Sequence, residues 1–245
     1  MPDETLTPDD LRRRYDAEAE RYDEKRYVSP KGRYYMEAEA KLLQKLCAGK
    51  KRICDVATGT GKNVEALYDQ SEFIVGVDIS MNMLRLTQNK MNLSQRDRAV
   101  LIQADIGHLP FKDNAFDLVL SSKFFHNVPV HTHRTFFKEM ERVVCCIVII
   151  ELFNRMAWFG LPHFLCRLRQ LFRSKGSRSY YPWAWQRVTG PRKRICSMNG
   201  FGVGLPLSDI HYRFLPLLFR TINQLMMYTP FKYIAPKLIF AINVE

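Results

Sequence analysis

Gly59 and Gly61 lie in a run of small residues, 57–61, that directly follows a mostly apolar segment, 52–56. The apolar segment predicts a buried parallel strand, and a helix is expected over 62–69. Small side chains let a ligand approach the backbone closely, and a helix start adds unpaired N–H groups that favour a carboxylate or a ribose oxygen. A strand, a glycine turn and a helix in this order are typical of the nucleotide-type pocket of a doubly wound sheet.

Three kinds of ligand use such a turn, and the spacing of the glycines separates them. A P-loop requires Gly-x4-Gly-Lys followed by Ser or Thr, but Val56 stands at the first glycine position and Asn63 replaces the hydroxyl residue. A dinucleotide fingerprint requires a third glycine, and Val64 stands there instead. The remaining ligand is S-adenosylmethionine.

Two acidic residues downstream support this third ligand. Asp78 ends a second apolar strand, 73–78, and lies 17 residues after Gly61. This place suits a carboxylate that accepts hydrogen bonds from both ribose hydroxyls. Asp105 ends a third expected strand, 100–105, where it can accept from the adenine amino group.

Five segments then resemble, in order and at the family's spacing, the class I S-adenosylmethionine-dependent methyltransferases. They are 21–23 (Arg-Tyr-Asp), 55–61, 76–84, 104–111 and 116–121. The resemblance runs from about Tyr15 to Glu151 and is closest to the ubiquinone/menaquinone-biosynthesis type and its lipid and small-molecule relatives. Any one segment is a weak signal, but five in order are a strong one.

The resemblance implies an α/β fold: a Rossmann-like, seven-stranded, mostly parallel, doubly wound sheet with helical insertions that form a lid. It also implies that the 57–61 turn wraps the methionine part of S-adenosylmethionine, that Asp78 binds ribose and that Met83 packs on adenine. Asp105 and Ile106 would fix the adenine edge, and Tyr22 would close over the cofactor. The full cofactor-binding set comprises Tyr22, Asp55, Ala57, Thr58, Gly59, Gly61, Asp78, Ile79, Met83, Asp105, Ile106 and Ser121.

The chain departs from the family in two places. Ala57 stands where the family usually has glycine. Two outcomes stay open: the turn tolerates the extra methyl group, or the methyl group weakens cofactor affinity. The usual Pro-Gly-Gly turn before the fifth strand is missing, so a helix over 131–144 runs almost directly into the strand 145–151.

The elements that position these residues follow from the chain's periodicity. Helices are expected from Thr7 to about Tyr22 and over 34–47, and strand and helix then alternate to Glu151, which predicts a parallel sheet covered on both faces. Residues 192–201 resemble the family's last helix and Gly-Phe turn, and 238–244 predict the final strand. We divide the chain into N-terminal capping helices (1–50), a cofactor-binding core (51–151), and lid insertions with the last strands (152–245), the insertions being 152–190 and about 213–236.

The net charge of +12 is unevenly distributed. Residues 1–151 hold 23 Lys or Arg and 23 Asp or Glu, whereas 152–237 hold 14 basic residues, one acid and all three tryptophans. This asymmetry implies an anionic partner. Apolar helical stripes flanked by Lys, Arg and Trp favour an anionic membrane surface over RNA, although an ordinary solvated face stays open.

The remaining composition gives the expected cellular context. The acidic, polar N-terminus shows no signal peptide, and the longest apolar run is too short to span a bilayer. The six cysteines contain no Cys-x-x-Cys pair, so we expect reduced, structural thiols and no metal site. These features predict a cytoplasmic protein with peripheral membrane attachment. Oligomeric state cannot be predicted.

Candidate catalytic and substrate residues follow the last strands of the core. His126 follows the fourth strand at the ligand-binding edge of the sheet and could take a proton from a hydroxyl, and Glu151 ends the fifth. Tyr180, Tyr181 and Trp183 are candidates for the substrate pocket. A merely structural role stays open for each.

These observations predict methyl transfer from S-adenosylmethionine to a small, hydrophobic or anionic, or lipidic molecule, at a membrane surface. Quinone-type phenols and lipid amines or hydroxyls are the candidate methyl acceptors. The alternatives are an RNA methyltransferase and a non-catalytic, cofactor-binding assembly factor. The Asn-Pro-Pro-Tyr type motif of enzymes that methylate base amino groups is absent after the fourth strand, where 121–124 reads Ser-Ser-Lys-Phe.

Overall fold

The computed structural model describes residues 7–91, 97–154, 179–180, 185–190, 194–201, 221 and 237–244. Most of the two expected insertions, with Trp158, Tyr181 and Trp183, lies outside these described residues.

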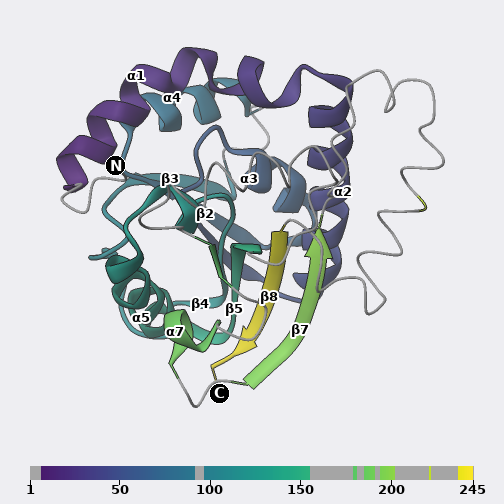
Figure 1. Ribbon diagram of the computed structural model, residues 1–245, viewed down its shortest axis with the longest axis vertical. Helices are drawn as coiled ribbons and strands as arrows, with labels where there is room; N and C mark the ends of the chain where they lie inside the picture. The colour runs from purple at the N-terminus through teal and green to yellow at the C-terminus, as the bar shows by residue number, and fades with distance from the viewer. Residues whose placement is uncertain are drawn as a thin grey trace, which may run out of the picture.

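A single mixed sheet forms the centre of the molecule, with strand order β3-β2-β1-β4-β5-β8-β7 (Figure 1). The first five of these run parallel to their neighbours, and β8 is antiparallel to both β5 and β7. A two-residue strand, β6, pairs with the end of β5. Their bounds are β1 Arg52–Val56, β2 Phe73–Asp78, β3 Ala99–Gln103, β4 Phe116–Ser121, β5 Val144–Asn154, β6 Ser179–Tyr180, β7 Arg194–Phe201 and β8 Lys237–Asn243. The expected seven-stranded, mostly parallel, doubly wound sheet is confirmed, with β6 as an addition.

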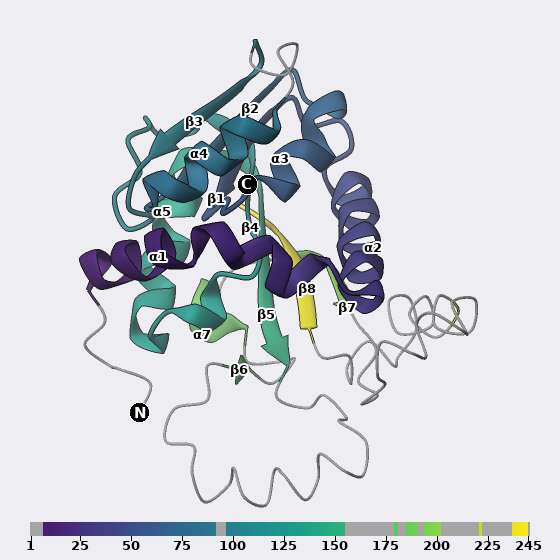
Figure 2. The same cartoon turned by 90° about the horizontal axis from the view of Figure 1, so that it is seen from above.

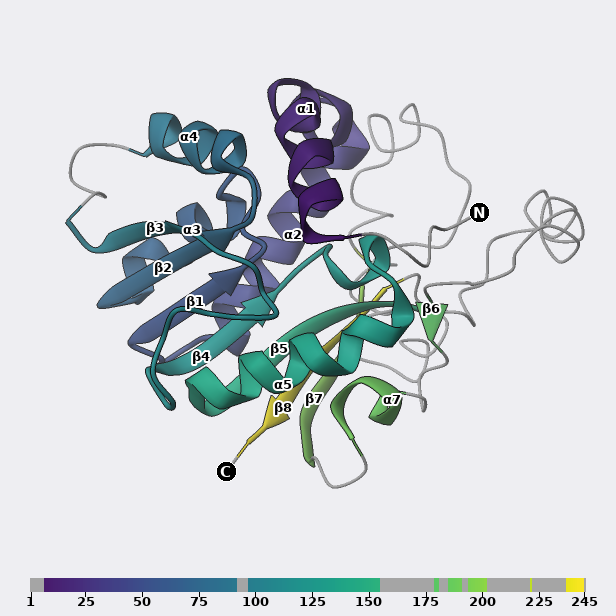
Figure 3. The ribbon, with the colours of Figure 1, turned by 90° about the vertical axis from the view of Figure 1, so that its left-hand side faces the viewer.

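Helices cover both faces of the sheet. Figure 3 shows α5 (His133–Val143) and α7 (Gln186–Thr189) in front of the sheet and α2 (Pro30–Leu46) behind it. The inward sides of the strands divide accordingly into two apolar clusters. Phe137 and Met140 of α5 belong to one, and Leu42 and Leu43 of α2 to the other. The remaining helices are α1 (Pro8–Tyr27), α3 (Lys62–Leu67) and α4 (Met81–Lys90), with 3-10 turns η1 (Tyr68–Gln70), η3 (Phe125–Asn127) and η4 (Val130–Thr132).

Helix α1 begins with a capping box, in which the Thr7 hydroxyl accepts from the Asp10 N–H and Asp10 accepts from the Thr7 N–H. It continues five residues beyond the expected end at Tyr22, to Tyr27. Figure 2 shows α1 running across the molecule in front of α4 and towards α2, and both helices contact it. This course takes α1 over the edge at which the parallel strands end.

The structure resolves two further sequence expectations. The helix expected within 192–201 is wrong, because residues 194–201 form β7, which pairs with β8 and has a register shift between Ile195 and Ser197. The missing turn before β5 has a simple structural counterpart: α5 ends at Val143, and Val144 is already extended, with φ −107° and ψ 144°. Helix and strand therefore join with no intervening loop.

The glycine turn after β1 is constrained by α4, which packs on it. Gly61 has φ +78°, and a Cβ there would lie 2.3 Å from Cγ2 of Thr87. Gly59 has φ +58°, but a Cβ at that position would meet nothing within 4 Å. Conformation alone thus favours glycine at 59, whereas conformation and packing both require it at 61.

Replacing these two glycines by alanine should separate the two effects. Gly59→Ala is expected to cost about 1 kcal/mol of unfolding free energy, for the left-handed backbone. Gly61→Ala should cost at least about 1 kcal/mol more, because Thr87 must move. Denaturant unfolding of both variants measures the difference, and equal stabilities would contradict the packing constraint.

Candidate cofactor and methyl-acceptor site

The turn from Ala57 to Gly61 bends the chain sharply between β1 and α3. Ala57, Gly59 and Gly61 all have positive φ, at 58°, 58° and 78°. The Thr58 N–H donates to the Val77 carbonyl of the neighbouring strand at 2.9 Å. Ala57 therefore adopts a backbone conformation that glycine usually occupies.

The carboxylate of Asp78, at the end of β2, is bound to this turn. Its Oδ2 accepts from the Gly59 N–H at 2.7 Å, and its Oδ1 accepts from the Ser80 N–H at 2.9 Å. Burial raises the pKa of Asp78 to about 6, although these two N–H groups favour the charged form. Each oxygen keeps a further lone pair, so the carboxylate can still accept hydrogen bonds from a ligand.

Asp55 shapes the same turn from beneath. It is fully buried and accepts from the Thr58 hydroxyl at 2.6 Å and from the Asn63 amide at 3.1 Å. Burial raises the pKa of Asp55 to about 7. Its side chain fixes the turn, and it is not among the residues that line the pocket above it.

A pocket of about 620 Å³, open at its mouth, lies above the turn at the carboxyl end of the parallel strands. Its walls are mostly apolar, and the Asp78 and Asp105 side chains add carboxylates to them. We call it the apolar lobe. It is lined by Leu11, Tyr15, Tyr22, Val56, Ala57, Gly59, Val77, Asp78, Ile79, Met83, Ala104, Asp105, Ile106, Ser122, Lys123 and Phe124.

A smaller, more polar lobe of about 340 Å³ shares one wall with the first. The shared residues are Tyr22, Ala57, Gly59, Ser122 and Lys123. Thr58, Thr60, Lys62 and Asn63 complete the polar lobe. The two lobes meet where the turn after β1 faces the residues after β4.

Helix α1 is fixed over the pocket at two points. Asp16 accepts from the Ser80 hydroxyl at 2.6 Å and from the Asn82 N–H at 3.2 Å. Asp23 accepts from the Thr60 hydroxyl at 2.6 Å and pairs with Lys90. Between these two anchors, α1 contributes Tyr22 to both lobes.

The pocket fits S-adenosylmethionine in its chemistry. The apolar lobe offers Ile79, Met83 and Ile106 to a flat base, and the buried Asp78 carboxylate to a pair of hydroxyls. The polar lobe offers hydroxyl, amide and ammonium groups to an amino-acid end. A ligand with an adenosine part and a methionine part matches the two lobes in this order.

Comparison with known proteins agrees with a site for S-adenosylmethionine. Residues 54–145 match the family described as a methyltransferase domain. This part of the chain is similar to that domain. The match supports S-adenosylmethionine as the cofactor that the sequence resemblance implies.

Curated relatives share this part of the chain. A demethylmenaquinone methyltransferase of Bacillus cereus is 37% identical over 91 residues, which cover 37% of each protein. The ubiquinone/menaquinone biosynthesis C-methyltransferase UbiE of Wigglesworthia glossinidia brevipalpis is 40% identical over 80 residues, 31% of this chain and 32% of that protein. A demethylmenaquinone methyltransferase of Lactiplantibacillus plantarum is 32% identical over 119 residues, 47% of this chain and 50% of that protein. The chain therefore matches half or less of the length of these relatives.

Solved structures agree with the described fold. Magnesium protoporphyrin IX methyltransferase from Synechocystis PCC 6803, with bound SAH, superposes with a TM-score of 0.62 at 14% identity, covering 96% of this chain and 98% of the other. An S-adenosylmethionine-dependent methyltransferase from Aquifex aeolicus gives 0.53 at 14% identity, covering 98% and 100%. The fold is that of the class I methyltransferases.

Most predicted cofactor residues meet at the two lobes. Tyr22, Ala57, Gly59, Asp78, Ile79, Met83, Asp105 and Ile106 line the apolar lobe, and Thr58 lines the polar one. Asp55, Gly61 and Ser121 do not line either lobe. Sequence reasoning did not propose Ser122, Lys123 and Phe124 as binding residues. Their place directly after β4, at the ligand-binding edge of the sheet, is the signal that could have found them.

The two predicted catalytic residues lie next to the pocket rather than in its walls. Glu151 is buried in β5, and its carboxylate pairs with the Lys237 ammonium at 2.7 Å. Burial opposes ionisation of Glu151, but Lys237, Lys123 and His126 outweigh it and lower its pKa. His126 is thus close enough to interact with Glu151. Of the substrate candidates, Tyr180 lies in β6 beside Asn154, whereas Tyr181 and Trp183 lie outside the described residues. Among the described residues, no group of three or more His, Cys, Asp or Glu side chains could hold a metal ion.

If Asp78 binds ribose hydroxyls in its ionised form, cofactor affinity should depend on pH. As the pH falls through about 6, Asp78 takes up a proton and loses acceptor capacity. Binding of S-adenosylhomocysteine should therefore weaken about tenfold between pH 7 and pH 5. Calorimetry across this range measures the dependence.

Two variants isolate the contribution of Asp78. Asp78→Asn should bind about 1.5–3 kcal/mol more weakly at pH 7, because a charge-assisted pair of hydrogen bonds is lost, and should show no step near pH 6. The exposed Asp9→Asn serves as the control and should behave as wild type. Equal binding by Asp78→Asn and wild type would exclude Asp78 from the cofactor site.

Proposed function

We propose that this protein transfers the methyl group of S-adenosylmethionine to a small or lipidic molecule, with a quinone-type phenol as the leading candidate. The observation that carries this proposal is the two-lobed pocket over the Asp78-bound turn, with Ser122 and Lys123 in the wall that the lobes share. The names of the relatives, demethylmenaquinone and ubiquinone/menaquinone methyltransferases, support the substrate class.

When bound, the cofactor supplies a methyl group on a positively charged sulfur, which is already a good leaving group. The task that falls to the chain is positioning, because a methyl acceptor must lie in line with the breaking bond at about 3–3.5 Å. The wall shared by the two lobes is where the adenosine and methionine parts would join. A methyl acceptor must therefore approach this wall, close to Tyr22, Ser122 and Lys123.

Helix α1 contributes by restricting the access of solvent to the apolar lobe. Leu11 and Tyr15 are apolar or partly buried residues that line the apolar lobe from above. Their helix is bound to the sheet edge through Asp16 and Asp23. The cofactor then enters and leaves either through the open mouth of the pocket or by a movement of α1.

Direct assay of the methylated product tests the proposal. Incubation with S-adenosylmethionine carrying a deuterated methyl group and a reduced naphthoquinone should give a singly methylated product, detected by mass spectrometry. Lipid amines, lipid hydroxyls and tRNA, tested in parallel, cover the other acceptors. Asp78→Asn should lower the yield at subsaturating cofactor, whereas Asp9→Asn should not.

The outcome separates the candidate functions. Product from tRNA alone would replace the small-molecule proposal with RNA methylation. Binding of S-adenosylhomocysteine without transfer to any acceptor would favour the non-catalytic assembly factor.

We keep His126 as the candidate base for a hydroxyl acceptor, on the basis of its place after β4 and its interaction with Glu151. His126→Ala should lower turnover about 10²–10⁴-fold and leave cofactor affinity unchanged. Paired measurements of turnover and of S-adenosylhomocysteine binding provide the check. Near-wild-type turnover would leave His126 with a packing role only.

The proposal extends to a membrane surface because residues 152–237 carry 14 basic residues, one acid and all three tryptophans. Each basic residue near an anionic bilayer contributes about 1 kcal/mol, within about a Debye length. In the described part of the chain, none of the helices combines the length and the hydropathy that a membrane span needs. Attachment would therefore be peripheral if it rests on this basic segment.

Vesicle sedimentation at two salt concentrations tests this attachment. Binding to anionic vesicles should weaken with salt but persist in part, because apolar side chains such as Trp158 also insert. Neutral vesicles serve as the control. Failure to bind anionic vesicles, together with retention of tRNA that falls steeply with salt, would favour nucleic acid instead.

A further inference from the structure

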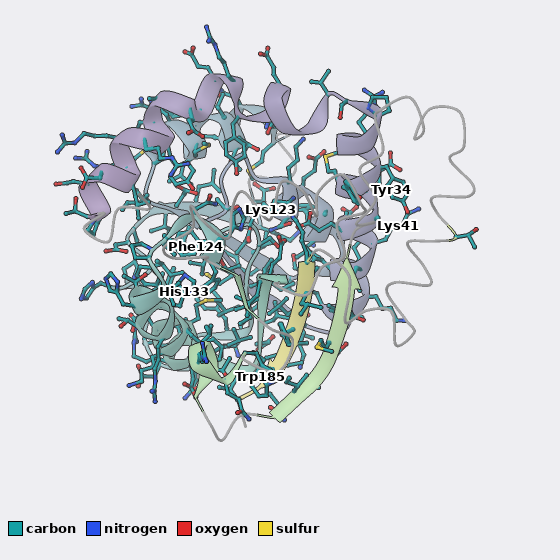
Figure 4. All side chains as sticks on the ribbon, viewed as in Figure 1. Tyr34, Lys41, Lys123, Phe124, His133 and Trp185 are labelled. Atoms are coloured by element: carbon teal, nitrogen blue, oxygen red, sulfur yellow. The ribbon has the colours of Figure 1, made fainter. Side chains whose placement is uncertain are left out.

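Lys123 combines three unusual features. It is a long, charged residue in the left-handed backbone region, at φ +56°. It lines both lobes of the pocket, at the wall where the methyl group would be transferred. Its ammonium lies 2.5 Å from Oε2 of Glu39, a carboxylate whose side chain is only 3% exposed. Figure 4 shows Lys123 near the middle of the molecule, below α1 and beside Phe124.

The backbone conformation of Lys123 is held by the surrounding structure. The side-chain amide of Asn127 donates to the Lys123 carbonyl at 2.6 Å. Left-handed non-glycine residues cost of order 1 kcal/mol or more and gather at functional sites. This conformation keeps the lysine at the wall shared by the two lobes.

The charges around Lys123 come from four elements. Glu39 lies on α2, His126 on η3, Glu151 on β5 and Lys237 on β8. Two carboxylates and two ammonium groups balance one another, with His126 beside them. Asp78, Asp105 and Lys62 are the other charged residues of the pocket walls.

The Glu39 carboxylate of this pair is bound to Lys123 through one of its two oxygens. Within the described part of the chain, the second carboxylate oxygen of Glu39, Oε1, is buried and accepts no hydrogen bond. Burying an ion pair brings little net stability, because desolvation offsets the attraction. An ion pair that brings little stability, and whose lysine lines both lobes of the pocket, is better explained by a role of Lys123 towards a ligand.

We propose that Lys123 binds the deprotonated hydroxyl of an acidic methyl acceptor, a phenolate or enolate, and so selects this class of substrate. The inference rests on the proposed function and assigns it a specificity-determining residue. On binding, the hydroxyl proton passes by way of His126, the candidate base, to solvent, and the Lys123 ammonium stabilises the resulting oxygen anion. An unneutralised lysine beside the positively charged sulfur of the cofactor would weaken cofactor binding. Glu39 neutralises Lys123 until the acceptor anion competes for it.

A chromogenic phenol tests the proposal without turnover. A nitrophenol, whose ionised form alone absorbs visible light, is titrated across pH in the presence of protein saturated with S-adenosylhomocysteine. Wild-type protein should lower the pKa of the bound phenol by about one unit or more, because an opposite charge within about 4–6 Å has this effect. Lys123→Met should abolish the shift, and Lys123→Arg should retain it. Lys41→Met, the same substitution at an exposed position of α2, is the matched control and should equal wild type.

Two further variants test whether the shift in the phenol pKa depends on Lys123 and on its competition with Glu39. Glu39→Gln removes the competing carboxylate, so the shift should be larger than in wild type. Lys123→Met leaves the Glu39 carboxylate buried without its lysine, which can prevent folding. If the single variant does not fold, the double variant Lys123→Met/Glu39→Gln is used in its place. The double variant should also show no shift.

The outcomes distinguish this inference from the proposed function. Suppose that wild type binds S-adenosylhomocysteine by calorimetry. If the phenol then does not bind saturably, or if its pKa is the same with wild type and with the Lys123→Met variants, the proposed role of Lys123 is overturned. The proposal of methyl transfer is not affected by that result. A smaller shift with Glu39→Gln would contradict competition between Glu39 and the phenolate. Failure of wild type to bind S-adenosylhomocysteine would instead overturn the proposed function itself.

Discussion

The Asp78 carboxylate is bound on both oxygens by backbone N–H groups, one from Gly59 after β1 and one from Ser80 before α4. This arrangement joins the ends of two neighbouring parallel strands and sets the shape of the pocket between them. Ser80 extends the chain of contacts, because its hydroxyl donates to Asp16 on α1. The helix that covers the pocket is therefore bound through the same residues that form its floor. A change at Asp78 is expected to affect the turn, the covering helix and the ligand together.

Burial of charge is the energetic cost of this arrangement. Burial near the carboxyl ends of β1 and β2 raises the pKa values of Asp55 and Asp78, to about 7 and about 6. The groups that donate hydrogen bonds to these carboxylates are neutral. Glu39 and Glu151 are as deeply buried, but each pairs with a lysine. The two groups differ in what they can do. Unpaired carboxylates offer lone pairs to neutral hydroxyls, whereas the paired lysines offer positive charge to an anion.

The sequence predicted much of the cofactor half of the site, for identifiable reasons. The bounds of β1, β2 and β4 follow from buried apolar runs, and Asp78 follows from its place at the end of one of them. Strand β7 was missed because its structure comes from pairing with β8 rather than from local preference. Lys123 was missed for a similar reason: its significance depends on a left-handed backbone and on Glu39, a partner on a distant helix. The roles of His126, Glu151 and Tyr180 stay predictions, and neither His126 nor Glu151 lines the pocket.

A crystal structure of the protein with S-adenosylhomocysteine is the most direct test of the account. The account predicts both ribose hydroxyls within hydrogen-bond distance of Asp78, the adenine against Met83, and the sulfur at the wall shared by the two lobes, facing Lys123. Adenosine bound in the polar lobe, or ribose hydroxyls that do not contact Asp78, would contradict it.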